Sequence, residues 1–561
     1  MRLKNIILIG SALLLCSSCS YLDFDETNNL YTQEDIYKYF DRTKQMLTNV
    51  YSYMPQDFGV IAGAMRDCAS DDAVFGATGG LVQSFTNGNW SALNTIDTQW
   101  NLYNGIRAAN EFLESIEKTD FTRFEHNGDY QNWVKQLKFF PYEARILRAQ
   151  YFFELARRYG DIAMPKTMLT QEEANTIGKT PFNEVIAFIV SECNDAIAQL
   201  PETYAGQPNN ETGRITKGYA MALKSKALLY AASLLHNPSM DKEKWKESAK
   251  AALDLINTGL YELDPGVKVN DVTSPEVVLF RMNGDNSAFE LNNFPIRFTE
   301  GQRTKPATGT FPSQNLVDAF QTINGYDVTL EKNGWICDDP KFDPQKPYEN
   351  RDPRLARTVL ANGMTFKDSE IQFYPGGIDY AAVSQGGSPT GYFLRKYIQE
   401  TTSFVVNKEV NNKHAWIIYR YAETLLAYAE SMIEAFDNPD YTDATYTKSA
   451  RWAINQVRNN AEMPDITTTG KDEFIHALQN EWRVEFAFED HRFWDIRRWK
   501  IGDKTQCELY GVNVNRSPDG ILTFEQELYS SRAWNERMYL YPIPQSEIYI
   551  NANLSPQNTG W

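Results

Sequence analysis

Residues 481–500 read EWRVEFAFEDHRFWDIRRWK and combine a heavy aromatic load with many charged side chains. Three glutamates recur at every fourth position and would form one row on a helix: Glu481, Glu485 and Glu489. Three arginines follow within reach of that row: Arg492, Arg497 and Arg498. Guanidinium groups that are paired with carboxylates can be buried beside aromatic rings. This stretch therefore predicts a buried helical hairpin with satisfied ion pairs, and the alternative is a carboxylate active site.

The helical pattern extends over much of the chain. The segment 142–161, YEARILRAQYFFELARRYGD, has a thick apolar face and small residues that let a neighbouring helix approach closely. Further helical segments with alanines at their contacts follow between residues 180 and 258. Successive antiparallel helices of this length are typical of tetratricopeptide-like repeats. We therefore predict a mainly α fold built on a tetratricopeptide-like helical-repeat scaffold.

The middle of the chain lacks the helical pattern of the segments on either side. Between about residues 266 and 414 the helical period disappears, glycine and proline accumulate, and aromatic residues are scattered. We predict a large irregular, loop-rich insertion at 266–414, followed by helices at 415–500 and an extended C-terminal tail. The chain then divides into an N-terminal half, residues 19–265, and a C-terminal half, residues 266–561.

The first nineteen residues have the layout of a lipoprotein signal peptide, which we assign to residues 1–18. Arg2 and Lys4 precede an apolar run at 6–15, which is too short to span a bilayer, since that takes about 20 residues. Two serines then precede Cys19 as in a bacterial lipobox, although Cys16 stands where leucine is usual. We predict that Cys19 is lipidated; plain secretion and an inner-membrane anchor are the alternatives.

Composition and charge exclude several classes of partner. The 561 residues include 31 Tyr, 31 Phe and 12 Trp, enough to build a large core and leave rings for the surface. The formal net charge of -18 argues against binding to nucleic acid, whose phosphates require a basic face. It argues equally against adhesion to anionic lipid surfaces.

No catalytic or metal-binding constellation stands out. The chain has no G-x-S-x-G, H-E-x-x-H or Walker motif, and its five histidines show no ligand spacing. The acidic segment 437–443 lacks the glycine and terminal glutamate of an EF-hand loop and is better explained as a solvated turn. Four cysteines follow Cys19 without zinc or redox spacing, and their disulfide state stays open: Cys68, Cys193, Cys337 and Cys507. We expect no enzymatic activity and no cofactor.

Two loop regions have the composition of a carbohydrate site, in which rings pack on sugar faces and polar groups bond the hydroxyls. The first region supplies these candidates: Asp67, Asp71, Asp72 and Trp90. The second region, within the insertion, supplies three more: Trp335, Tyr374 and Tyr380. We predict exposed rings at these positions, because a tryptophan in a glycine-rich loop is less easily explained as core. The carboxylates could equally cap a helix or hold a cation such as Ca²⁺.

Several motifs, in this order along the chain, resemble the SusD/RagB family of surface glycan-binding lipoproteins of Bacteroidetes-type bacteria. The segments 142–161 and 481–500 match family patterns, as does the ending LYPIPQSEIYINANLSPQNTGW, apart from one extra residue at Ser555-Pro556. Shorter matches lie at 317–320, 350–354 and 391–396. The resemblance covers nearly the whole chain after residue 18 and implies the same helical-repeat fold.

The resemblance also implies a function. The chain would be a lipid-anchored, cell-surface protein of the outer membrane that captures an oligosaccharide or polysaccharide and delivers it to a SusC-like TonB-dependent transporter. The acidic residues that follow Cys19 resemble a surface-export signal. Two alternatives remain, namely a peptide-binding RagB-like lipoprotein and a helical-repeat scaffold for a protein partner.

Overall fold

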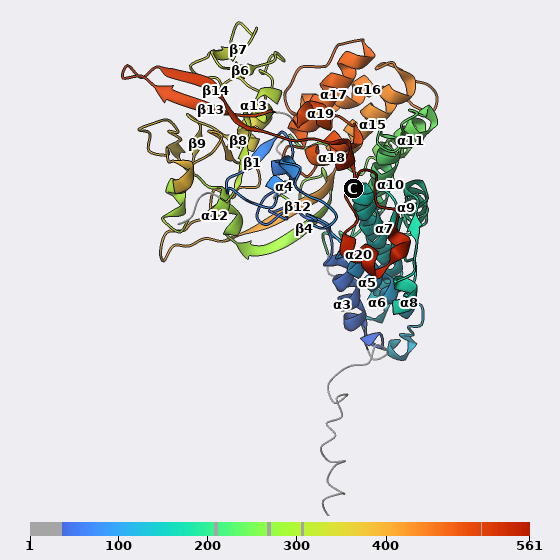
Figure 1. Ribbon diagram of the computed structural model, residues 1–561. Helices are drawn as coiled ribbons and strands as arrows, with labels where there is room; N and C mark the ends of the chain where they lie inside the picture. The colour runs from blue at the N-terminus through green and yellow to red at the C-terminus, as the bar shows by residue number, and fades with distance from the viewer. Residues whose placement is uncertain (1–35, 207–210, 266–270, 304–307, 507) are drawn as a thin grey trace, which may run out of the picture.

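The computed structural model describes residues 36–206, 211–265, 271–303, 308–506 and 508–561. A tall stack of helices forms one side of the molecule, and a loop-rich part with short sheets leans out from its upper end (Figure 1). The predicted signal peptide and Cys19 lie outside the described residues. Among the helices that are described, none is both long and apolar enough to cross a membrane.

The N-terminal half is a stack of helices in which each long helix packs on the next. The stack contains α3 (Phe40–Tyr51), α5 (Leu102–Ile116), α7 (Phe140–Tyr159), α9 (Phe182–Ile197), α10 (Lys217–Ala232) and α11 (Lys242–Ile256). Nearly every side chain of α7 is buried, because α5 and α9 cover it from two sides. The predicted mainly α, tetratricopeptide-like scaffold is confirmed.

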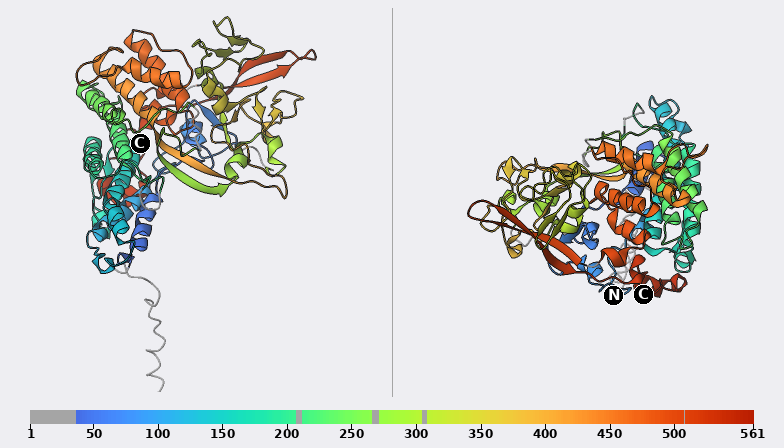
Figure 2. Two further views of the ribbon diagram at one scale, coloured as in Figure 1. Left: turned by 180° about the vertical axis from the view of Figure 1, so that it is seen from behind. Right: turned by 90° about the horizontal axis from the view of Figure 1, so that it is seen from above.

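The helical stack continues across the insertion. Helix α11 packs directly on α15 (Tyr421–Phe436), although some 160 residues separate them in sequence, and α15 in turn contacts α16 (Ala450–Asn460) and α17 (Lys471–Glu485). The left view of Figure 2 shows these C-terminal helices, in orange, at the top of the stack. The insertion interrupts the sequence of the repeat scaffold but leaves its packing intact.

The insertion holds more strand than we predicted. Its base is closed by β4 (Val277–Asn286), which pairs antiparallel with β12 (Asn412–Arg420), so the helix predicted from residue 415 begins only at Tyr421. The other insertion strands have only two or three residues, too few for a period to show in sequence: β5 (Thr310–Pro312), β6 (Thr329–Glu331), β7 (Gly334–Ile336), β8 (Val359–Leu360), β9 (Thr365–Phe366), β10 (Ser369–Glu370) and β11 (Phe393–Leu394).

A long hairpin replaces part of the predicted extended tail. Strands β13 (Glu508–Arg516) and β14 (Leu522–Ser531) pair antiparallel and project beside β6 and β7 (Figure 1). The amide of Val512 donates to the carbonyl of Thr390 at 2.8 Å and ties the hairpin to the insertion. Gly511 permits this approach, because a Cβ there would lie 2.8 Å from the Cα of Thr390.

The row of glutamates is buried and paired, but with other arginines than we predicted. Arg420 bonds Glu489 at 2.8 Å and Glu276 at 2.7 Å, and it also contacts Glu485. Glu481 accepts from Arg458 at 3.0 Å. The row of glutamates therefore links Arg420 at the end of β12, Glu276 beside β4, and Arg458 of helix α16. It does not close a local hairpin.

The three arginines of the 481–500 stretch contact side chains other than the glutamates of the row. Arg498 donates to Asp495 at 2.7 Å and to Glu430 at 2.9 Å. The guanidinium of Arg497 lies 3.4 Å from the centre of the Phe493 ring. Arg492 pairs with a carboxylate near the N-terminus of the chain, described below. The prediction of buried ion pairs is right for Arg492 and Arg498, whereas Arg497 forms no ion pair within the described residues and donates to the carbonyl of Phe493. The predicted pairing with the glutamate row is wrong, because α17 ends at Glu485 and the side chains after it face different neighbours.

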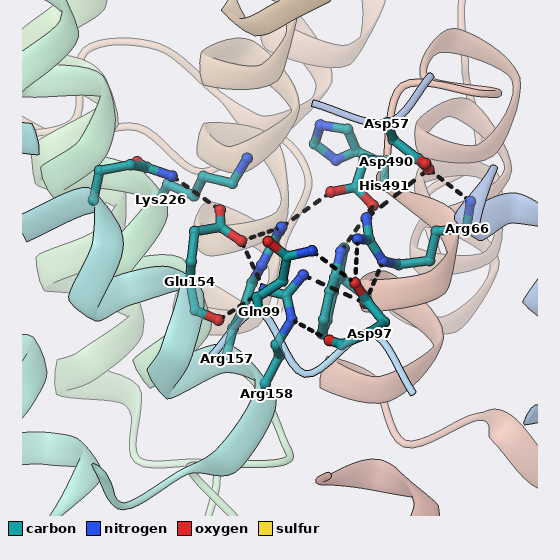
Figure 3. A network of polar contacts seen from close by, with 12 residues as sticks. Asp57, Arg66, Asp97, Gln99, Glu154, Arg157, Arg158, Lys226, Asp490 and His491 are labelled. Carbon is teal, nitrogen blue, oxygen red and sulfur yellow. Dashed lines mark hydrogen bonds and ion pairs between the residues drawn. The ribbon is translucent and has the colours of Figure 1, made fainter. Parts of the chain in front are cut away.

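A second ion-pair network joins the N-terminal and C-terminal halves (Figure 3). Arg66 bonds Asp97 at 2.9 Å and also contacts Asp490. Arg157 of α7 reaches Asp490 at 3.0 Å, and Arg158 reaches Asp97 at 3.4 Å. The network fixes the loop after α3 against α7 and against the turn that follows α17.

Removing the guanidinium of Arg420 should destabilise the fold strongly. The variant Arg420→Gln leaves three buried carboxylates short of a partner, so we expect the free energy of unfolding to fall by about 3–5 kcal/mol. The control Lys250→Gln removes a cation that pairs with Asp254 at the surface and should cost less than about 1 kcal/mol. Guanidinium denaturation measures both, and equal losses would contradict the expectation.

Because these carboxylates are ionised and paired in the folded protein, we expect the free energy of unfolding to fall in acid. Burial alone would raise the pKa of Glu485, but Arg420 and Arg354 lower it to about 2. Because this pKa is lower in the folded state, its contribution is present above about pH 4.5 and is lost as the pH falls towards 2. In Glu485→Gln the decline of unfolding free energy between these values should be smaller by about 3 kcal/mol, at about 1.4 kcal/mol per pKa unit. A pH profile parallel to that of the unmodified protein would rule this out.

Candidate functional site

The predicted acidic loop residues lie inside the protein. Arg492 forms a two-pronged pair with Asp71, with both nitrogen–oxygen distances at 2.8 Å, and Arg483 bonds Asp72 at 2.7 Å. Burial alone would raise the pKa of Asp71, but Arg483 and Arg492 hold it well below its ordinary value. Asp71 and Asp72 are therefore committed to the fold, because their side chains attach this loop to the C-terminal helices.

Asp67 is also buried, beside other carboxylates. Burial, followed by the charges of Asp72 and Asp57, raises the pKa of Asp67 well above its ordinary value. Across the described residues, no group of three or more His, Cys, Asp or Glu side chains could hold a metal ion.

The ring of Trp90 is part of the core and not of the surface. Its side chain is 1% exposed, and the ring lies 4.6 Å from Phe85, 5.1 Å from Tyr541 and 4.5 Å from Trp561, centre to centre. The loop that carries it packs back onto the C-terminal end of the chain. The prediction of an exposed ring is therefore wrong for Trp90.

The candidates in the insertion lie closer to solvent. Trp335 of β7 is half-buried, and its ring packs 5.9 Å from Tyr348 and 6.0 Å from Phe524, centre to centre. Tyr374 is only 9% exposed, so the prediction of an exposed ring is wrong for it as well, and its hydroxyl accepts from Arg516 at 2.8 Å. Tyr380 is 48% exposed and rests 5.5 Å from Phe373.

A cavity of about 490 Å³ lies between the β13–β14 hairpin and the insertion. Its wall includes three rings, Tyr348, Tyr374 and Phe524, and the polar side chains of Glu349, Glu370 and Arg516. Trp335 backs two of these rings from behind, so the structure brings Trp335 and Tyr374 to one place. Tyr380 is not part of the wall. Within the described residues, Glu370 and Arg516 form no ion pair, which leaves both charges available to a ligand.

Sequence reasoning missed most of this cavity. Tyr348, Phe524 and Arg516 are separated by up to 176 positions, and only the fold brings them together. The alternation of apolar and polar residues in β13 was a usable signal for the hairpin, since Leu509, Val512 and Val514 are buried. Of the later cysteines, Cys68, Cys193 and Cys337 are free thiols, and Cys507 lies outside the described residues.

The fold and this cavity define a class: a helical-repeat protein whose loop-rich insertion carries an aromatic-lined cavity. Residues 275–561, more than half of the chain, match the SusD family, and the chain belongs to that family. Residues 20–229 match a second family description, "Starch-binding associating with outer membrane".

Relatives and solved structures agree with this assignment. The chain is 26% identical over 433 residues to SusD-like protein P2 of Formosa agariphila, covering 75% of this chain and 73% of that protein. A SusD-like protein from Bacteroides fragilis is 26% identical, with a TM-score of 0.76 over 94% of this chain and 98% of that one. A SusD-like carbohydrate-binding protein from the same species is 25% identical, with a TM-score of 0.72 over 93% and 100%.

Truncating Trp90 should affect stability and leave the cavity in the insertion unchanged. The variant Trp90→Ala removes a fully buried ring, so we expect the free energy of unfolding to fall by about 3–5 kcal/mol. The control Tyr549→Ala removes a ring that is 78% exposed and should cost less than about 0.5 kcal/mol. Thermal and chemical denaturation compare the two. A fully stable Trp90→Ala protein that has lost ligand binding would instead place Trp90 in the site.

Proposed function

We propose that this protein is a cell-surface glycan-binding lipoprotein that captures an oligosaccharide or polysaccharide at its loop-rich insertion. The observation that carries the proposal is the cavity of about 490 Å³, with three rings and unpaired charges in its wall. The function is binding and transfer of a ligand, with no bond made or broken.

The chemistry of the wall suits a sugar. The rings of Tyr348, Tyr374 and Phe524 line the wall, and Tyr348 is the most exposed of them, since Tyr374 and Phe524 are 9% and 5% exposed. Apolar ring surface of this kind contacts the C–H faces of sugar rings. Arg516 donates hydrogen bonds and Glu370 accepts them, which are the contacts that orient hydroxyl groups in a largely apolar pocket. Tyr380 adds an exposed ring on the loop that follows Tyr374. We assign Asp67, Asp71, Asp72 and Trp90 to the core of the fold and not to the ligand site.

The names of the relatives support a carbohydrate ligand. One of the similar solved structures is a SusD-like carbohydrate-binding protein, and another, 18% identical and alike in fold, is a laminarin-binding SusD-like protein. The match of residues 20–229 to a starch-binding description points to the same class of ligand.

The proposal includes an anchor and a partner. Lipid on Cys19 would hold the protein at the outer surface of the outer membrane, on a tether of acidic and aromatic residues. The captured glycan would pass to a SusC-like TonB-dependent transporter. Family membership and the description "associating with outer membrane" support this arrangement.

Affinity electrophoresis tests the ligand and the site together. The protein starting at Ser20 is run in gels that contain starch, laminarin or another polysaccharide of a panel. We expect retardation by at least one glycan, and about a tenfold loss of affinity in Arg516→Ala and in Glu370→Gln, because each loses a direct bond of about 1.4 kcal/mol. Trp335→Ala should also weaken binding, since two rings of the wall lose their support.

The control is Glu525→Gln, which removes an exposed charge from the same hairpin outside the cavity and should bind like the unmodified protein. Retardation that persists in all three cavity variants would keep the function and move the site. Binding of peptides in place of every glycan would favour the RagB-like alternative.

A further inference from the structure

A second cleft lies on the helical half, away from the insertion. It has a volume of about 290 Å³, at the lower end of the range for small-molecule sites. One side is formed by Trp100 and Tyr103 at the start of α5, and the other by the segment after α7 and by α20 (Gln545–Ile550). In Figure 1, α20 lies beside α5 and α8 (Gln171–Ala174), far from β13 and β14.

The polar side chains of this cleft fall into two groups. Asn110 and Asn551 are buried and already bonded, since their amides donate to the carbonyls of Pro165 at 3.0 Å and of Ile177 at 2.8 Å. Three others form no hydrogen bond or ion pair through their side chains within the described residues: Asn104, Arg107 and Glu547. The amide of Asn104, the guanidinium of Arg107 and the carboxylate of Glu547 are therefore free to bond a ligand beside the half-buried ring of Trp100.

The cleft continues along α5 into a larger hollow. A cavity of about 750 Å³ adjoins it, and Arg107 and Met168 line both. The wall of the larger cavity is polar and of mixed charge, with Glu114, Lys118 and Arg123 among its residues. Together the two cavities form one groove, which we call the α5 groove.

We propose that the α5 groove is a second carbohydrate-binding site, which holds a chain of several sugar units with one ring against Trp100. These three side chains can donate hydrogen bonds to the hydroxyl groups of a sugar and accept hydrogen bonds from them. Because they include one positive and one negative charge, they suit a neutral, hydroxyl-rich chain better than a charged one. The aliphatic wall formed by Met168, Leu169 and Ile177 contacts C–H faces. Two sites on one molecule let a polysaccharide bind at two points, which raises the overall affinity without new contacts at either site.

Fluorine NMR tests this site separately from the cavity in the insertion. The protein is labelled with 5-fluorotryptophan, and the resonances of Trp100 and Trp335 are assigned with Trp100→Phe and Trp335→Phe. Oligosaccharides from laminarin, starch, xylan and pectin are titrated in turn, beside a mixture of tripeptides. We expect at least one saccharide to shift the Trp100 resonance, and this shift should persist in Arg516→Ala, which affects only the cavity in the insertion.

Variants of the groove itself complete the test. Ala174 is exposed and lines the cleft, so Ala174→Phe should fill the cleft and abolish the shift of Trp100. Arg107→Ala should weaken it at least fivefold, whereas Lys138→Ala, which removes an exposed cation elsewhere, should not. A Trp100 resonance that no saccharide moves overturns the inference, and so does a shift caused by tripeptides alone. Either result leaves the proposed function intact, because Trp335 and Arg516 report on that separately.

Discussion

The structure depends on buried arginines that are shared between carboxylates and aromatic rings. The guanidinium groups of Arg66, Arg157 and Arg158 lie 5.4, 4.1 and 4.8 Å from the Trp494 ring, while their nitrogens bond Asp97 and Asp490. Arg157 and Arg158 belong to α7, whereas Arg66, Asp97 and Asp490 come from other segments that are distant in sequence. A buried charge without its partner costs several kcal/mol, so these segments are stable only when they meet.

This constraint separates the parts that hold the molecule together from the parts that can carry a ligand. The loop between α3 and α5 is committed to the fold, because Asp71 and Asp72 neutralise arginines of the C-terminal helices. Part of the insertion is committed in the same way, since Arg354 pairs with Glu481 and Glu485 and Lys396 pairs with Glu489, but these buried pairs do not belong to the wall of the aromatic-lined cavity. The aromatic-lined cavity accordingly lies in the insertion, where its wall can vary without unpairing a buried charge.

Several features of the fold followed from local patterns. Helix α7 lies within a few residues of the predicted segment 142–161, and α9, α10 and α11 fall in the range 180–258 where helices were predicted, because an apolar face with a helical period shows in any window of that length. The buried ion pairs of residues 481–500 were expected for the same reason, since charges placed among so many rings need partners. The short strands of the insertion were missed, since two or three residues show no period. The hairpin β13–β14 was missed although its strands have nine and ten residues and β13 alternates between apolar and polar positions.

Local periodicity and contiguous motifs were enough to predict the class of fold, the family and the presence of buried ion pairs. Tertiary structure alone decided which arginine meets which carboxylate and which rings face solvent. Trp90 and Trp335 occupy similar glycine-rich contexts, yet one is enclosed by Tyr541 and Trp561 and the other backs an open cavity. Whether a ring is exposed depends on the side chains that the fold packs against it, and these side chains can lie hundreds of residues away in the sequence.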